Sequence, residues 1–142
     1  MKRQPDCIWL VDDDEPTNYL NAMVLEETGF EGRIVTIQRG EEALARLRAN
    51  GAGEVPPPDL LFLDLNMPGM DGWEFLEAYR QTEAFARARP VIVILTTSLN
   101  PDEEARARRL DDVDDFLQKP LTPEVLEEVL DRHFSERTRN TR

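Results

Sequence analysis

The chain has 142 residues, of which 40% are hydrophobic, and its formal net charge is −12 at pH 7. This length suits one globular domain with its own core. The excess of carboxylates argues against nucleic-acid binding, which depends on Lys and Arg contacts to phosphates. The apolar runs are much shorter than a membrane span, so we expect no membrane association. The single cysteine, Cys7, cannot form an internal disulfide, which favours a cytoplasmic location.

Segments of strand length alternate with segments of helical periodicity along the chain. In chain order, we expect strand 7–12, helix 15–29, strand 33–37, helix 40–50, strand 60–64, helix 72–82, strand 91–96, helix 100–110, strand 114–118 and helix 122–134. Such alternation indicates βαβ units, whose right-handed crossovers give a parallel sheet with helices on both faces. We therefore predict a flavodoxin-like, doubly wound (βα)5 fold of the α/β class, with five parallel strands in the order 2-1-3-4-5 and five helices.

Several helices carry local start signals. Asp14, Asn100 and Thr122 are the expected N-caps of the first, fourth and fifth helices, and a proline follows closely after each. The first helix is expected to bury an apolar stripe made of Leu20, Met23, Val24 and Leu25.

Chemically useful side chains stand where four of the five expected strands end. Asp12 and Asp13 close the first strand, Asp64 the third, Thr96 the fourth, and Lys119 follows the fifth. The second strand, expected at the sheet edge, ends without such a group. In open α/β sheets, ligands bind outside the carboxyl ends of the strands, where the strand order reverses. The sequence therefore predicts that these five side chains meet in one crevice.

Three carboxylates in one crevice repel one another, which implies a divalent cation. Oxygen ligands favour Mg²⁺, which also accepts phosphate oxygens. The Thr96 hydroxyl and the Lys119 ammonium would complete a frame for a tetrahedral anion. A carboxylate can act as a nucleophile and form an acyl phosphate. We therefore expect Asp64 to accept a phosphoryl group, while Asp12 and Asp13 hold the metal.

Four motifs in this order resemble a known family. They are "VDDDE", "LDLNMPGMDG", "ILTTS" and "DDFLQKP", and each stands at the end of an expected strand. Together they are similar to the CheY-like receiver domains of two-component response regulators. The resemblance covers about residues 6–134. We assign residues 1–137 to a stand-alone receiver domain and 138–142 to a polar tail, with no output domain, and we interpret the Pro- and Gly-rich segment 51–59 as a surface spacer.

The resemblance implies a role for each matched residue around the metal. Asp64 would be the phosphoacceptor and also a metal ligand. Asp13 would bind Mg²⁺ directly, with Mn²⁺ as an alternative ion, and Asp12 would act mainly through water. The backbone carbonyl of Asn66 would be the third protein ligand. The family also usually has a cis peptide bond at Lys119–Pro120.

The resemblance further implies a switch. Thr96 would close onto the phosphoryl oxygens, Lys119 would pair with them, and Phe116 occupies the position of the switch aromatic residue. Rotation of Phe116 would remodel the face formed by 100–110, 114–118 and 122–134. The chain departs from the family pattern in having Phe116 in place of the common Tyr and Thr97 where Ala or Gly is frequent.

The implied function is that of a signalling protein rather than an enzyme, although it would promote its own phosphorylation and dephosphorylation. The phosphodonor would be a sensor histidine kinase or a histidine phosphotransfer protein, and the output would be contact with an unknown downstream protein. The chain would be a monomer or a phosphorylation-dependent dimer.

Two other functions stay open. A Mg²⁺-dependent phosphohydrolase would share the aspartyl-phosphate chemistry. Such hydrolases usually carry the nucleophile on the first strand and an Asp two residues later, whereas Asp64 is on the third strand and is followed by Asn66. A phosphorylation-independent adaptor would have no need of the complete set of site residues.

Overall fold

The computed structural model describes residues 4–49 and 56–134. A five-stranded parallel sheet has the order β2-β1-β3-β4-β5, which confirms the predicted topology. The elements are β1 (Cys7–Val11), α1 (Glu15–Glu27), β2 (Arg33–Ile37), α2 (Gly40–Ala49), β3 (Leu60–Leu63), α3 (Gly72–Arg80), α4 (Glu83–Arg87), β4 (Val91–Thr96), α5 (Pro101–Arg108), β5 (Asp115–Gln118) and α6 (Pro123–Phe134). The expected tail 138–142, the end of the assigned domain and most of the expected spacer lie outside the described residues.

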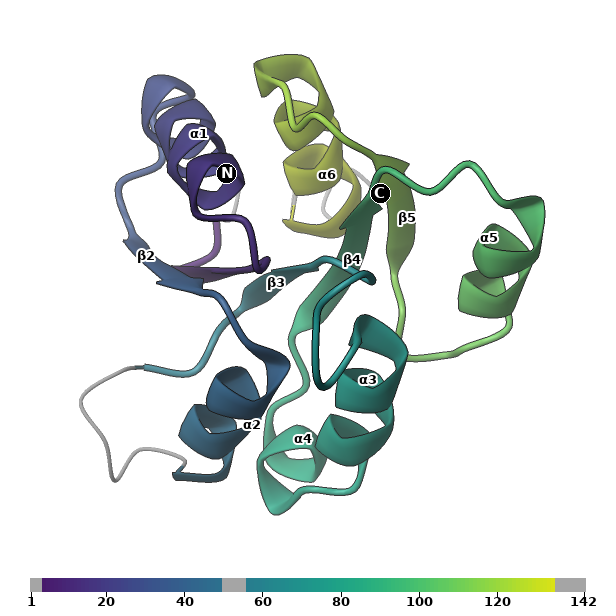
Figure 1. Ribbon diagram of the computed structural model, residues 1–142. Helices are drawn as coiled ribbons and strands as arrows, with labels where there is room; N and C mark the ends of the chain where they lie inside the picture. The colour runs from purple at the N-terminus through teal and green to yellow at the C-terminus, as the bar shows by residue number, and fades with distance from the viewer. Residues whose placement is uncertain (1–3, 50–55, 135–142) are drawn as a thin grey trace, which may run out of the picture.

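The helices cover the two faces of the sheet in separate groups. Helices α1 and α6 lie on one face, and α2 and α3 lie on the other (Figure 1). Strands β1 and β3 are buried along their whole length because both faces of the central sheet are covered. Alternate residues of each strand therefore enter different cores.

Within the residues that the structure describes, no helix is both long and apolar enough to cross a membrane.

The local helix signals are confirmed. The Asp14 side chain accepts a hydrogen bond from the Thr17 backbone N–H, and Asn100 caps α5 through the N–H of Asp102. Thr122 accepts from the N–H of Val125 at the start of α6. These side chains satisfy backbone donors that the first helical turn leaves free.

The expected apolar stripe of α1 is mostly wrong. Leu20 and Met23 are 58% and 36% exposed, and of the four expected residues only Leu25 is fully buried. The buried face instead consists of Asn18, Asn21 and Leu25, spaced three and four residues apart. The apolar pattern was misleading because two amides occupy the positions where α1 passes the carboxyl ends of the strands.

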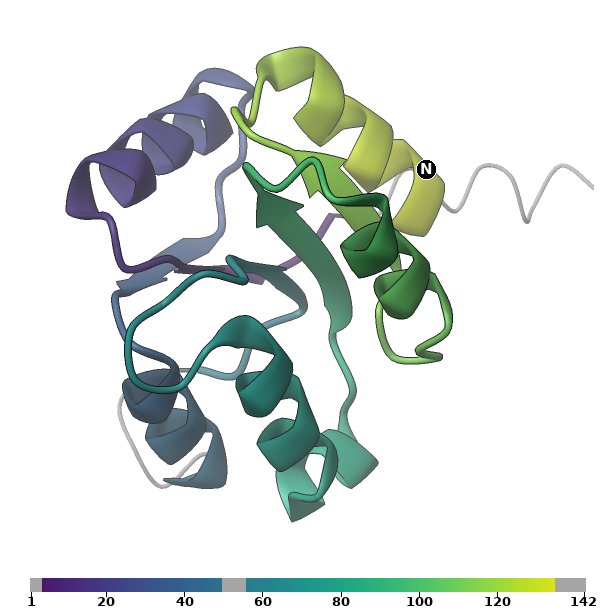
Figure 2. The same ribbon diagram turned by 45° about the vertical axis from the view of Figure 1, so that its right-hand side comes forward.

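The structure contains one helix more than predicted. The expected helix 72–82 ends at Arg80, and α4 follows it as a separate short helix, so the described residues form six helices rather than five. Thr82 is the N-cap of α4, because its hydroxyl accepts a hydrogen bond from the N–H of Phe85 at 3.1 Å. The Phe85 ring then packs edge-on against Tyr79, with 5.0 Å between the centroids. Figure 2 shows α3 and α4 in succession below the sheet.

Candidate functional site

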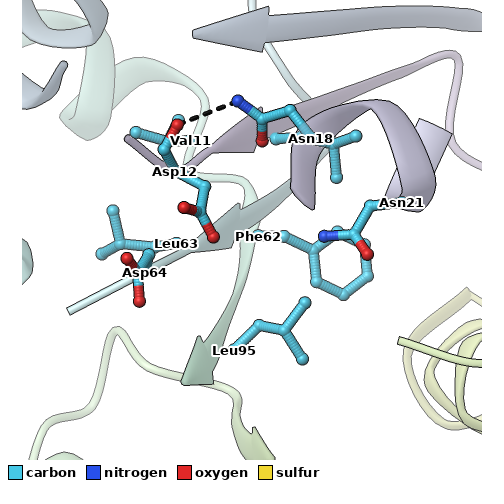
Figure 3. A pocket seen from close by; sticks show the side chains of 9 residues that line it. Val11, Asp12, Asn18, Asn21, Phe62, Leu63, Asp64 and Leu95 are labelled. Atoms are coloured by element: carbon cyan, nitrogen blue, oxygen red, sulfur yellow. Dashed lines mark hydrogen bonds between the residues drawn. The ribbon is translucent and has the colours of Figure 1, made fainter. Parts of the chain in front are cut away.

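An acidic centre forms where the first and third strands end. Val11 and Leu63 are partners in the register of β1 and β3, so Asp12 and Asp64 follow side by side. The carboxylates of Asp12, Asp13 and Asp64 each offer an oxygen within 4.8 Å of the other two. Asp12 and Asp64 are buried, whereas Asp13 is exposed. The three carboxylates therefore meet beyond the carboxyl ends of the strands, as predicted. Figure 3 shows two of them, Asp12 and Asp64.

Lys119 reaches the same centre from the other side. Its backbone N–H donates to the Thr96 carbonyl oxygen at 2.8 Å, which extends the pairing of β4 and β5 by one step. Its Nζ lies 2.6 Å from Oδ2 of Asp12 and 3.5 Å from Oδ1 of Asp64. The Lys119–Pro120 peptide bond is cis, as the family resemblance implied. The ammonium thus supplies a positive charge to two buried carboxylates.

Burial governs the electrostatics of the acidic centre. Burial and, after it, the charge of the neighbouring Asp12 carboxylate together raise the pKa of Asp64 to about 6, against the opposing effects of Lys119 and the Asn66 backbone. Burial alone would lower the pKa of Lys119, but the hydrogen bond to Asp12 and the charges of both carboxylates outweigh it, so the net shift is upward. The centre therefore holds more negative charge than Lys119 neutralises.

The donor set fits a hard divalent cation. Three carboxylates within reach of one another supply only oxygen ligands, which is the preference of Mg²⁺ and Mn²⁺. Asp13 is exposed, so an ion can enter from solvent and keep water ligands. Asn66 is exposed directly beyond Asp64 and Leu65. Its carbonyl as a metal ligand stays a prediction.

The two expected switch residues share one face of the sheet. Thr96 is fully buried at the end of β4, and its Oγ1 accepts a hydrogen bond from the N–H of Ser98 at 3.1 Å. Phe116 pairs in register with Ile94, two residues before Thr96, so both side chains point the same way. The Phe116 side chain is buried in the core that also contains Ala107 of α5. A change at Thr96 could therefore reach Phe116 and α5 through packed side chains.

Gly72 allows α3 to approach the strand that carries Asp64. Its N–H donates to the Leu65 carbonyl oxygen at 2.9 Å. A Cβ at this position would lie 2.7 Å from the Asp64 carbonyl oxygen and 2.9 Å from the Leu65 Cα. These are backbone atoms, so the close approach cannot be relieved by turning a side chain.

We expect Gly72→Ala to lower the free energy of unfolding by about 1–3 kcal/mol, because the added methyl overpacks a rigid contact. It should also weaken any metal binding, since the loop after Asp64 must shift. Urea denaturation and Mg²⁺ titration of the same variant measure the two effects. Wild-type values in both experiments would contradict this account of Gly72.

Two buried amides beside the acidic centre were missed by the sequence analysis. The Nδ2 group of Asn18 donates to the backbone carbonyl oxygen of Asp12 at 2.9 Å, and Asn21 lies one turn further along α1. Both line a small cavity together with Asp12 and Asp64 (Figure 3). Polar residues on a helix face do not by themselves indicate burial, so the sequence offered only the three-residue spacing as a signal.

Comparison with known proteins decides the family. The model of the response regulator receiver domain matches residues 8–131. The chain therefore belongs to the receiver domain family. Proteins of this family typically act as phosphoacceptors in two-component signalling with histidine kinases, rather than as catalytic enzymes.

Individual relatives span the chain to different extents. It is 37% identical over 127 residues to the probable methanogenesis regulatory protein FilR2 of Methanothrix harundinacea, covering 89% of this chain and 80% of that protein. It is 33% identical over 119 residues to the sensor histidine kinase GacS of Pseudomonas protegens, covering 83% of this chain but only 12% of GacS. In some relatives the receiver domain is thus most of the protein, and in others it is a small part.

Solved structures of related proteins agree with the fold. A two-component response regulator from Cytophaga hutchinsonii superimposes with a TM-score of 0.81 at 30% identity, covering 92% of this chain and 97% of that one. The Mn²⁺-bound form of the response regulator Rcp1, a protein of Synechocystis, gives a TM-score of 0.70 at 31% identity, covering 88% of each chain. This receiver domain therefore has a relative of known structure that binds a divalent cation.

Proposed function

We propose that this receiver domain accepts a phosphoryl group on Asp64 and signals through contact with another protein. The phosphodonor would be a sensor histidine kinase or a histidine phosphotransfer protein. One observation supports the proposal above others: a buried carboxylate, Asp64, lies beside two further carboxylates and 3.5 Å from a lysine ammonium. The pKa of about 6 leaves Asp64 mostly ionised, and hence nucleophilic, at neutral pH.

In the proposed reaction, an Asp64 carboxylate oxygen attacks phosphorus as the P–N bond to the donor imidazole breaks. The oxygen–phosphorus bond forms at Asp64, and the electron pair of the broken P–N bond stays with the donor ring, which takes one proton from solvent and leaves as neutral imidazole. A Mg²⁺ or Mn²⁺ ion held by Asp12, Asp13, Asp64 and the Asn66 carbonyl would neutralise phosphoryl charge. Lys119 would shift from the carboxylates to a phosphoryl oxygen, and the Thr96 hydroxyl would donate to another.

The output in this proposal is a change at the α5–β5–α6 surface. Movement of Thr96 towards the phosphoryl group would open space for Phe116 to rotate, since both side chains lie on one face of the sheet. Helix α5 is suited to respond, because Ala107 is its only buried residue. In this mechanism, the added charge at Asp64 would shift the balance between two arrangements of Phe116 and the α5–β5–α6 surface. Phe116 has no hydroxyl, so its two positions would differ in packing alone.

Two alternatives are less well supported. Phosphohydrolases of this chemistry usually carry an Asp two residues after the nucleophile as general acid, but here Asn66 stands at that position. An adaptor that ignores phosphorylation would not need the ion pair between Lys119 and the acidic centre. We further propose that the domain works in the cytoplasm, as a monomer or as a phosphorylation-dependent dimer.

The test is to incubate the protein with acetyl phosphate, with and without Mg²⁺, and to record its intact mass. We expect a Mg²⁺-dependent phosphoryl adduct that is stable to acid and labile to base, and that is absent from Asp64→Asn. An adduct of equal yield in Asp64→Asn would refute the assignment of the acceptor. Failure of acetyl phosphate and of a panel of histidine kinases to label a protein that still binds Mg²⁺ would favour the adaptor.

A further inference from the structure

The buried face of α1 carries two amides directly behind the acidic centre. Asn18 and Asn21 are only 3% and 6% exposed. They line a cavity whose other walls are the two buried carboxylates and apolar side chains, among them Phe62 and Leu95 (Figure 3). Neither amide is a motif residue of the proposed phosphoryl transfer. Their burial beside Asp12 and Asp64 therefore calls for a separate explanation.

The Asn18 amide group donates a hydrogen bond within the described protein but accepts none. Its Nδ2 donates to the Asp12 carbonyl oxygen at 2.9 Å, whereas its Oδ1 is buried and has no partner among the described residues. An unpaired buried carbonyl is costly, and native proteins usually satisfy such groups with protein or with ordered water. The oxygen thus indicates a small hydrogen-bond donor that comes from solvent.

The cavity has the size of one water molecule. The cavity volume is about 10 Å³, close to the lower limit for holding a single water. Its polar walls offer the two to four partners that a buried water needs, because the two amides and the carboxylates of Asp12 and Asp64 face it. An ion with its own hydration shell would not fit in this volume.

Asn18 also completes the anchoring of Asp12. The Asp12 N–H donates to the Ile37 carbonyl oxygen at 3.0 Å, and its carbonyl accepts from Asn18. The carboxylate Oδ1 accepts from the Asp14 N–H at 2.9 Å, which leaves Oδ2 directed at Lys119. Asp12 lies beyond the end of β1, so it lacks full support from the sheet. The Asn18 hydrogen bond is therefore one of four polar contacts of Asp12 among the described residues, and it holds the backbone from which the carboxylate projects.

We propose that Asn18 and Asn21 hold one ordered water behind the acidic centre, and that this water and the Asn18–Asp12 hydrogen bond position Asp12 for a divalent cation. The inference rests on the proposed function, because it assigns positioning residues to the same metal site. Partners that orient a metal ligand typically change metal affinity by 10–100-fold when they are lost. Asn18 contacts neither the metal nor the phosphoryl group, so it is a positioning residue.

The test compares Asn18→Leu and Asn21→Leu with Leu25→Ala. Leu fills the amide volume but cannot hydrogen bond, whereas Leu25→Ala damages the packing of the same helix without touching Asp12. Mg²⁺ affinity is measured by isothermal titration calorimetry, and stability by urea denaturation. A high-resolution crystal structure of the metal-free wild type shows directly whether the cavity holds a water.

We expect Asn18→Leu to weaken Mg²⁺ binding about tenfold or more. Asn21→Leu, which keeps the Asp12 hydrogen bond, should have a smaller effect. Leu25→Ala should lose stability yet bind Mg²⁺ within about twofold of wild type. The crystal structure should show one water within hydrogen-bonding distance of Asn18 Oδ1.

Several outcomes would overturn the inference. Wild-type Mg²⁺ affinity in Asn18→Leu would refute the positioning role, and a dry cavity would refute the water. If Asn18→Leu does not fold, the Mg²⁺ affinity of Asn21→Leu and the crystal structure of the wild type test the inference instead. A wild-type protein that binds no Mg²⁺ would overturn the proposed function as well, whereas equal binding by wild type and Asn18→Leu would overturn this inference alone.

Discussion

Replacing Asp64 by Asn is expected to stabilise the metal-free protein at pH 7 by about 1–3 kcal/mol, although the variant loses the proposed phosphoacceptor. Burial and the charge of the Asp12 carboxylate together raise the pKa of Asp64 to about 6. Ionised Asp64 therefore costs folding free energy at neutral pH. An amide of the same shape removes the charge and keeps the packing.

The sign of the pH dependence follows from the direction of the shift. Because the folded-state pKa of Asp64 is raised above its ordinary value of 3.8, folding favours the protonated form. This contribution to stability is complete below pH 3.8 and is lost as the pH rises through about 6. The advantage of Asp64→Asn should therefore be small at pH 4 and nearly full at pH 7.

Urea denaturation of both proteins between pH 4 and pH 8, in the presence of a chelator, measures this difference. Asp111→Asn is the matched control, because Asp111 is exposed and its replacement should change stability by less than about 0.5 kcal/mol. Adding Mg²⁺ should reduce the difference in stability between Asp64→Asn and wild type, since the ion stabilises wild type by binding only its folded state. An Asp64→Asn protein no more stable than wild type at pH 7 would contradict the prediction.

Most of the fold could be predicted because its signals are local. The central strands are short runs of buried apolar residues, and the polar residues that end them mark one edge of the sheet. Parallel order then brings Asp12 and Asp64 together without any further information. The site was accessible from sequence for the same reason: its residues stand at strand ends, where topology dictates their neighbours.

The predictions from sequence were wrong where tertiary contacts determine which residues are buried. The buried face of α1 was misplaced because Leu20 and Met23 are apolar but face solvent, while Asn18 and Asn21 face the cavity. Helix α4 was missed because it is only five residues long, and its N-cap, Thr82, lay inside the expected helix 72–82. No local pattern signals the burial of an amide, since that burial depends on what packs against it.

The ion pairs that Lys119 forms with the acidic centre could not be predicted from the sequence either. The resemblance implied a contact with phosphoryl oxygens, and the structure pairs the ammonium with Asp12 and Asp64 instead. Both interactions are compatible, because the same charge can serve the carboxylates before phosphorylation and the phosphoryl group afterwards. Lys119 would then stabilise the resting protein as well as the proposed active one.

Lys119→Met is accordingly expected to destabilise the metal-free protein by about 3 kcal/mol at pH 7, because it leaves two buried carboxylates without their counter-charge. The Lys119 side chain is only 17% exposed, so solvent screens the loss weakly. Lys119 also lowers the pKa of Asp64. Its removal should therefore push that pKa further upward, and partial protonation limits the cost below pH 6.

Mg²⁺ should reverse most of this loss, which distinguishes a missing charge from damaged packing. The cation and the ammonium neutralise the same carboxylates, so Lys119→Met should bind Mg²⁺ more tightly than wild type and gain more stability from it. Urea denaturation with Mg²⁺ and with chelator, together with calorimetric titration, measures both effects. Arg89→Met is the control: it breaks a partly exposed pair with Asp114 and should cost at most about 1 kcal/mol, whether or not Mg²⁺ is present. If the instability of Lys119→Met were indifferent to Mg²⁺, the ammonium would not be the charge that balances the acidic centre.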